Sequence, residues 1–111
     1  MIRITVNRDE EGRIAGIRVR GHADYGEYGQ DIVCAAVSGI TIGLTNASES
    51  LLGVRLFREE DNTDGELDLR VPAGLSSETD GRVRFLLEAM QSSLRSIADE
   101  YKDYVQMDEH S

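Results

Sequence analysis

The sequence is poor in disulfide-forming and metal-binding residues, with one cysteine, Cys34, and two histidines among its 111 residues. A single cysteine excludes a disulfide within the chain and fits the reducing conditions of the cytoplasm. A structural zinc site needs about four ligands, drawn mainly from cysteine and histidine. The sequence therefore argues against a metal site built by this chain alone, and we expect no cofactor.

Basic residues are also scarce, because 12 Lys and Arg stand against 21 Asp and Glu, for a net charge of -9. A chain this acidic repels the phosphates of nucleic acids and of anionic membranes. We therefore expect neither nucleic acid nor a membrane among its partners. The same charge favours encounter with a basic protein or peptide.

Targeting and spanning segments are not evident in the sequence. The first residues alternate apolar and polar side chains and lack the cationic and apolar regions of a signal peptide. We recognise no run of the roughly twenty apolar residues that a membrane span needs. A length of 111 residues supports one domain. We expect a single cytoplasmic domain over residues 1–111, with a polar tail at 102–111 that frays.

The first half of the chain predicts a β-hairpin followed by a long helix. Apolar side chains alternate in residues 2–6 and again in 14–20, on either side of a turn-forming cluster at 9–12. From residue 32 to about 52, apolar residues dominate and no charge appears before Glu49. We expect this helix to be buried on most of its sides.

Two patterns within this helix suggest further contacts. Gly39 and Gly43 would let another element approach closely, and so small a domain cannot cover the helix on several sides. We therefore expect a homodimer. Small polar side chains also follow one face at helical spacing: Cys34, Ser38, Thr41, Thr45 and Ser48. Their usual role is to hydrogen-bond the carbonyl four residues earlier, and we favour a functional role only for the first two.

The second half of the chain predicts another hairpin and another helix. Residues 54–58 and 66–71 flank the turn DNTDG, and residues 81–104 carry one continuous apolar face at helical spacing. The expected order is β-β-α-β-β-α. This is an α+β fold in which two hairpins form one mainly antiparallel sheet packed with two helices.

The candidate chemistry lies in residues 21–38, GHADYGEYGQDIVCAAVS. Asp31 precedes the first apolar helical residue and is the predicted N-cap, which makes Cys34 the third helical residue. There the helix dipole favours a thiolate, and unpaired backbone N–H groups could stabilise an oxyanion. The negative charge of the Asp31 carboxylate disfavours the thiolate by like-charge repulsion. His22, placed at a strand end after the flexible Gly21, would supply a compensating imidazolium.

The segment between the two groups, residues 24–30, has the composition of a mobile lid. Gly26 and Gly29 supply freedom, and Tyr25 and Tyr28 offer apolar faces that could grip a substrate side chain. The tyrosines fit equally well a role in pinning the loop to the domain. The residues alone leave thiol catalysis and a packed, unreactive cysteine about equally supported.

Within this stretch, Gly21-His22-Ala23, Tyr25-Gly26, Gly29 and DIVCAAVS keep a fixed spacing. That spacing closely resembles the signature of the ribosomal-processing cysteine protease (Prp) family. The resemblance covers 18 residues and is specific. The rest of the chain agrees with the family only in length, acidity and element order.

The resemblance implies a cytoplasmic, homodimeric endopeptidase that removes a short N-terminal extension from a large-subunit ribosomal protein during ribosome assembly. It implies that Cys34 is the nucleophile and His22 the general base, with Asp31 and Ser38 at supporting positions. The flexible loop would order over the bound peptide. Whether Asp24, Asp31 or neither orients His22 stays open.

Two other functions fit the same residues. The first is a non-catalytic ribosome-assembly factor that binds a ribosomal protein, in which Cys34 only packs. The second is a redox switch at Cys34. The chain has no second cysteine to resolve an oxidised thiol, although a disulfide across a dimer would serve.

Overall fold

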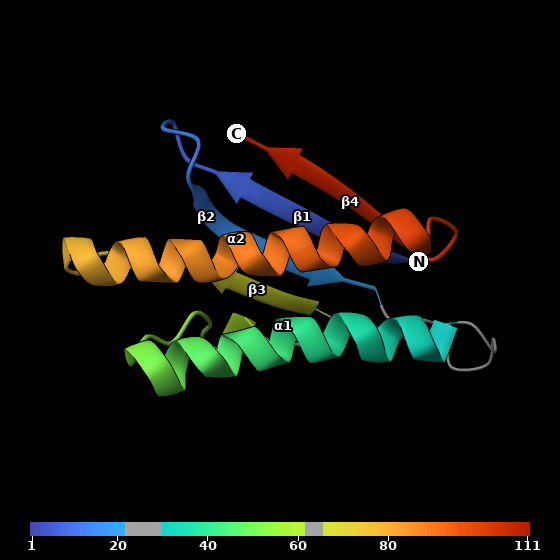
Figure 1. Cartoon of the computed structure of the whole chain (residues 1–111), viewed down its shortest axis with the longest axis horizontal. Helices are drawn as coiled ribbons and strands as arrows, with labels where there is room; N and C mark the ends of the chain where they lie inside the picture. Colours follow the sequence, from blue (N-terminus) through green and yellow to red (C-terminus); the bar gives the residue numbers. More distant parts are fainter. Residues whose placement is uncertain (22–29, 62–65) are drawn as a thin grey trace.

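The computed structural model describes residues 1–21, 30–61 and 66–111 as a sheet with two long helices packed against it (Figure 1). The elements are β1 (Ile2–Arg8), β2 (Ile14–Arg20), α1 (Gln30–Leu52), the short 3-10 helix η1 (Glu59–Asp61), β3 (Glu66–Arg70), α2 (Ser77–Glu100) and β4 (Val105–His110). Both predicted long helices and the first hairpin are confirmed, and the fold is α+β as expected.

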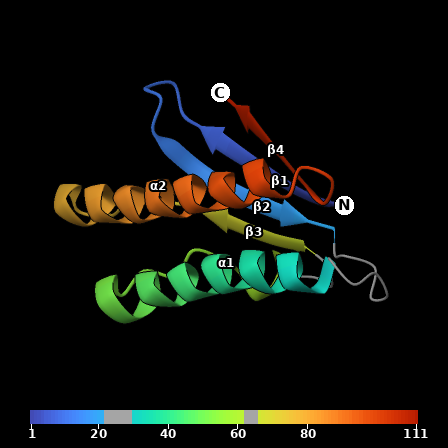
Figure 2. The same ribbon diagram turned by 45° about the vertical axis from the view of Figure 1, so that its right-hand side comes forward.

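The four strands form one mixed sheet in the order β3-β2-β1-β4. The pairs β1–β2 and β2–β3 are antiparallel, whereas β4 runs parallel to β1. Figures 1 and 2 agree that α2 crosses one face of the sheet and that α1 runs beside α2, next to the edge formed by β3. The core fills the space between this face of the sheet and the two helices.

The prediction of a strand at residues 54–58 is wrong. Val54 and Leu56 are buried, as the alternating pattern requires. However, a single backbone hydrogen bond joins this segment to β3, from the Arg70 N–H to the Leu56 carbonyl at 2.7 Å. Alternation reports which side chains are buried and not whether the backbone pairs. The second hairpin is therefore absent from the described residues, and the order is β-β-α-β-α-β.

The prediction of a frayed tail at 102–111 is also wrong, because β4 pairs with β1 over six residues. The helix before it runs from Ser77 to Glu100 instead of 81–104. In the sequence, Val105 follows Tyr101 at helical spacing and so continues the apolar pattern of the helix. In the structure it starts a new alternation and is 3% exposed. The strand is otherwise polar because the helices cover only one face of the sheet.

The polar stripe of α1 has the structural role that we considered more common. The Thr41 hydroxyl donates to the Val37 carbonyl at 2.8 Å, and the Thr45 hydroxyl to the Thr41 carbonyl at 2.6 Å. Ser48 is completely buried and donates instead to the Val54 carbonyl, at 2.8 Å. This last bond ties the end of α1 to the chain that leaves it.

Among the described helices, α1 alone has the length and composition of a membrane span, with a mean hydropathy of 1.3 over Ile32–Leu52. This differs from the expectation that the chain has no apolar run long enough for a membrane span. Such a match is weak, because a core helix of a soluble domain passes the same test. The buried inner face of α1, which includes Val33 and Val37, packs into the core together with residues from the sheet and α2. We therefore treat α1 as an element of the folded domain.

Replacing Ser48 with alanine should lower the free energy of unfolding by about 1–3 kcal/mol, because the buried Val54 carbonyl loses its partner. Ser50→Ala is the matched control, since its exposed hydroxyl makes only a long contact of 3.5 Å with the Ala47 carbonyl. The control should change stability by less than about 0.5 kcal/mol. Urea denaturation of the two variants measures the difference. Equal losses would contradict the proposed anchoring role of Ser48.

Candidate active site

The strand and the helix that flank the predicted site meet at one end of the molecule. β2 ends at Arg20 and α1 begins at Gln30. Figures 1 and 2 both place these two ends together, near the N-terminus of the chain. The fold therefore brings the chain entering His22 and the helix carrying Cys34 to the same region.

Gly21 controls how the chain leaves β2. Its φ of +78° lies in the region that side chains disfavour. A Cβ added at this position would also collide with the Met1 carbonyl oxygen. The φ of Gly21 and the close approach of the Met1 carbonyl both require a residue without a side chain. Glycine is therefore the residue that fits immediately before His22.

The position of Cys34 in its helix differs from the prediction. Because α1 begins at Gln30, Asp31 lies inside the first turn and is not the N-cap. Cys34 is then the fifth helical residue, and its N–H has the Gln30 carbonyl as its helical partner. The helix dipole acts most strongly within the first turn. Cys34 therefore lies further from the positive helix end than predicted. The N–H groups without a helical partner are those of the four residues before it.

The side chain of Cys34 lies at the boundary between core and solvent. It is half-buried and packs against the hydrophobic core, whereas the neighbouring Val33 is fully buried. Ser38, one turn further along the same face, is also half-buried. A thiol in this setting is held by packing on one side and remains accessible on the other, as a nucleophile requires.

Several predicted site residues lie outside the part of the chain that the structure describes. They are His22, Asp24, Tyr25, Gly26, Tyr28, Gly29 and the side chain of Asp31. Contact between His22 and Cys34, and the action of residues 24–30 as a lid, therefore stay predictions. Among the described residues, no group of three or more His, Cys, Asp or Glu could hold a metal ion.

One feature of this end of the sheet was not anticipated. Arg3 and Arg20 lie directly opposite each other on β1 and β2, and both are exposed. Like charges at such a cross-strand pair disfavour the pairing. The predicted hairpin fixes which residues of its two strands face each other, so this pair could have been found from the sequence. We did not predict a functional role for it. It gives an acidic chain a local positive charge next to Gly21.

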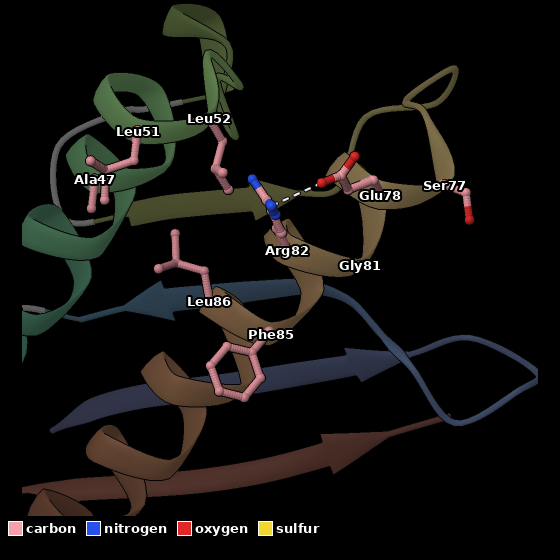
Figure 3. A pocket seen from close by; sticks show the side chains of 9 residues that line it. All are labelled: Ala47, Leu51, Leu52, Ser77, Glu78, Gly81, Arg82, Phe85 and Leu86. Atoms are coloured by element: carbon pink, nitrogen blue, oxygen red, sulfur yellow. Dashed lines mark ion pairs between the residues drawn. The ribbon is translucent and has the colours of Figure 1, made fainter.

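A large apolar pocket lies far from the thiol, between the end of α1 and the start of α2 (Figure 3). Its volume is about 520 Å³, and its apolar lining includes Leu51, Leu52, Phe85 and Leu86. Seventeen helical residues separate positions 34 and 51, or roughly 25 Å at about 1.5 Å per residue. This pocket therefore does not belong to the Cys34 site.

Comparison with known proteins identifies the family. Residues 1–106 match the family model described as cysteine protease Prp. The chain belongs to the cysteine protease Prp family. The ribosomal processing cysteine protease Prp of Bacillus subtilis is 33% identical over 103 residues, which cover 93% of this chain and 92% of that protein. Membership in the Prp family makes the chain a cysteine peptidase.

Solved Prp structures share the fold. Staphylococcus aureus Prp in complex with a substrate peptide has a TM-score of 0.75 and 29% identity, covering 98% of this chain and 99% of that chain. The same protein with a covalently linked product peptide has a TM-score of 0.74 and 31% identity over the same shares. The mixed sheet and two helices described above are thus the Prp fold.

We expect Gly21→Ala to lower the free energy of unfolding by more than Gly53→Ala does. Both glycines have a positive φ, of +78° and +68°, but nothing lies within 4 Å of a Cβ at Gly53. The Gly53 variant should cost about 1–2 kcal/mol from backbone strain, whereas the Gly21 variant adds the clash with Met1. Urea denaturation distinguishes the two. An equal or smaller loss for Gly21→Ala would show that the Met1 contact does not hold the bend.

Proposed function

We propose that this chain is an endopeptidase in which Cys34 is the nucleophile and His22 the general base. One observation carries the proposal. The chain belongs to a cysteine protease family and has a single cysteine, which lies at the end of the molecule where β2 and α1 meet. The half-buried position of the thiol supports it. The covalently linked product peptide of the Staphylococcus aureus relative is consistent with covalent catalysis.

The proposed reaction proceeds in two halves. His22 takes the Cys34 proton, and the thiolate attacks the scissile carbonyl carbon to form a tetrahedral oxyanion. Collapse of this intermediate breaks the C–N bond, leaving a thioester on Cys34, and the imidazolium gives its proton to the departing amine. His22 then takes a proton from water, whose oxygen attacks the thioester. The peptide acid leaves, and the thiol is restored.

Other residues of the signature receive supporting roles in this proposal. Gly21 lets the chain turn toward His22, because its φ and the nearby Met1 carbonyl leave no room for a side chain. Asp31 belongs to the first turn of α1, where a negative charge is proposed to stabilise the helix. Ser38 borders Cys34 on the next turn. Tyr25, Gly26, Tyr28 and Gly29 are proposed to cover the bound peptide.

The proposed substrate is the N-terminal extension of a large-subunit ribosomal protein, removed during ribosome assembly in the cytoplasm. The net charge of -9 supports a basic substrate, since it speeds encounter with ribosomal proteins that bind RNA. The relatives from Bacillus subtilis and Staphylococcus aureus carry the name of ribosomal processing proteases. We also propose a homodimer and no bound cofactor.

A second candidate is a non-catalytic assembly factor that binds the same ribosomal protein. The observation that favours it is the packing of Cys34 against the hydrophobic core, which is the usual role of a buried thiol. In this case Cys34 contributes only volume, and the acidic surface alone recruits the basic partner.

We expect Cys34→Ala to abolish cleavage of a peptide that spans the extension and the first mature residues. His22→Ala should lower kcat/KM by about 10²- to 10⁴-fold, the usual contribution of a general base. His110→Ala is the matched control, since this exposed histidine ends β4 and should leave kcat/KM unchanged. Mass spectrometry of timed reactions measures all three.

Three outcomes would contradict the proposal. Undiminished cleavage by Cys34→Ala would exclude the thiol as nucleophile. If neither the wild type nor any variant cleaves, but wild type and Cys34→Ala bind the ribosomal protein equally, the assembly-factor reading is correct. Equal losses for His22→Ala and His110→Ala would remove His22 from its role as the base.

A further inference from the structure

The two long helices cover one face of the sheet and leave the other face open (Figures 1 and 2). This open sheet face consists of Arg3, Thr5 and Asn7 of β1 and of the residues that pair with them across the sheet, directly or through β2. The apolar side chains that alternate with them along β1 are buried in the core. The open sheet face is therefore polar, and its charged side chains are directed toward solvent.

Arginines are concentrated on the open sheet face and beside its β3 edge. Four lie on the face itself: Arg3, Arg18, Arg20 and Arg70. Two more, Arg55 and Arg58, line a hollow beside β3 together with Arg70. These six are half of the 12 basic residues of the chain, whereas the strands place only three of its 21 acids on the same face. The three acids are Glu66, Asp68 and Asp108. The net charge of -9 is thus unevenly distributed.

Arg3 and Arg20 are exposed and directly opposite each other, and no carboxylate separates them. Glu66 pairs with Arg20 across the sheet, but its ion pair, at 3.4 Å, is with Arg18. Arg3 donates to the neutral side chain of Gln106 at 3.2 Å. Like charges at a cross-strand pair lower stability. A local arrangement that is unfavourable for folding is typical of a functional surface.

Two adjoining hollows extend this charge across β3. One has a volume of about 300 Å³ and is lined by Arg55, Arg58 and Arg70, and the other, of about 360 Å³, is lined by Arg18 and Arg70. Both also include Asp68, so they form one trough over β3. Asp68 is the only carboxylate among the described residues of this lining, and it is paired with Arg70 at 2.8 Å and Arg18 at 3.4 Å.

The spacing of the arginines fits an extended polyanion better than a small anion. Arg18 and Arg20 are two residues apart on one strand, or about 7 Å. Arg3 lies on the neighbouring strand, with its Cα about 5 Å from that of Arg20. A guanidinium can donate two hydrogen bonds to one phosphate. A chain of phosphates can therefore contact several of these arginines at once.

Competing carboxylates do not prevent such binding. Arg55 and Arg58 pair with Glu49 and Glu60 at 2.9 and 3.8 Å, but all four side chains are exposed. Exposed ion pairs contribute little free energy, so phosphate oxygens can replace these carboxylates. The acids of α2 lie on the far side of the sheet. At physiological salt, charges separated by more than about 8 Å are largely screened, so the open sheet face acts through its local charge.

The residues of the open sheet face also indicate how a nucleic acid would be bound. Sheets that recognise bases in single-stranded RNA present aromatic side chains on which the bases stack. The open sheet face has no Phe, Tyr or Trp. Its arginines can contact phosphates but offer no stacking platform, so the binding should not depend on base sequence.

We propose that the open sheet face and the trough over β3 bind the phosphate backbone of single-stranded RNA, with Arg3 and Arg20 as the main contacts. The choice of RNA rests on the proposed function, because the proposed substrate is a ribosomal protein. The expectation of no nucleic-acid partner followed from the net charge, which averages over the whole surface. Since Arg20 is two residues before His22, bound ribosomal RNA would hold the candidate active site close to the ribosomal particle.

The first test removes the paired arginines by combining Arg3→Gln with Arg20→Gln. Fluorescence anisotropy with a labelled oligouridylate, over a series of salt concentrations, measures the binding. Wild type should have a dissociation constant of about 10⁻⁴ to 10⁻⁶ M. Each lost contact should lower the salt slope by about 0.7, so the double variant should bind roughly 25-fold less tightly at about 0.1 M salt. Its stability in urea should not fall, because the like-charge pair is removed.

The matched control combines Arg82→Gln with Arg95→Gln on α2. Both arginines are exposed and lie on the helical side of the sheet. The control loses the same two positive charges, so a difference between the double variants reports the position of the charges and not their number. We expect the control to bind oligouridylate within about twofold of wild type. Oligoadenylate should bind wild type as oligouridylate does.

A second test asks whether ribosomal RNA is the source of the phosphates. The Cys34→Ala chain should co-sediment with purified large ribosomal subunits, and adding Arg3→Gln and Arg20→Gln should reduce the bound fraction at least about tenfold. Cleavage of the free extension peptide by the chain with these two arginine substitutions alone should keep the kcat/KM of wild type. Loss of RNA binding and loss of protease activity are therefore distinguishable.

Three results would overturn the inference. Wild type that fails to bind oligouridylate even at low salt would exclude RNA as the partner. Equal losses for the two double variants would show that overall charge, and not the open sheet face, determines binding. Tighter binding of an oligoglutamate peptide than of oligouridylate, lost in the Arg3→Gln and Arg20→Gln variant, would make an acidic protein segment the partner.

Discussion

The packing of the inner face of α1 against the core determines where the functional parts of this chain lie. Val33 and Val37 are buried there, and Thr41 and Thr45 bond to carbonyls of their own helix. With the helix fixed along this face, its first turns hold Cys34 at the end of the molecule where β2 finishes. The opposite side of the same helix is left uncharged and exposed. The proposed nucleophile and this exposed side can therefore occupy one helix without interfering with each other.

Much of the fold follows from local patterns in the sequence. Alternation and a turn cluster predicted the hairpin of β1 and β2, and helical spacing predicted both long helices. The strand β4 was missed because Val105 fits the spacing of the preceding helix as well as the start of a strand. The choice depends on β1 being available for parallel pairing, which is a tertiary effect. The segment 54–58 shows the converse case, where buried alternation occurs without a paired strand.

The elements that flank the candidate site were predicted in outline because they are close together in sequence. The bend at Gly21 and the placement of Cys34 near the start of a helix could both be read from single residues. The start of α1 was misplaced, since Asp31 is a good cap by type and nothing in its neighbours shows that the helix continues past it to Gln30. The paired arginines Arg3 and Arg20 were overlooked for a different reason. Their significance lies in the register of two strands and not in either residue.

The central claim is that Cys34 forms a covalent bond with the substrate, and acid quenching during turnover tests it most directly. The protein would be mixed with the extension peptide, quenched at low pH, digested, and mapped by mass spectrometry. The account predicts an acyl adduct, with the mass of the N-terminal cleavage fragment, on the digestion product that contains Cys34. Cleavage of the peptide with no adduct at Cys34, or with an adduct at another residue, would contradict it.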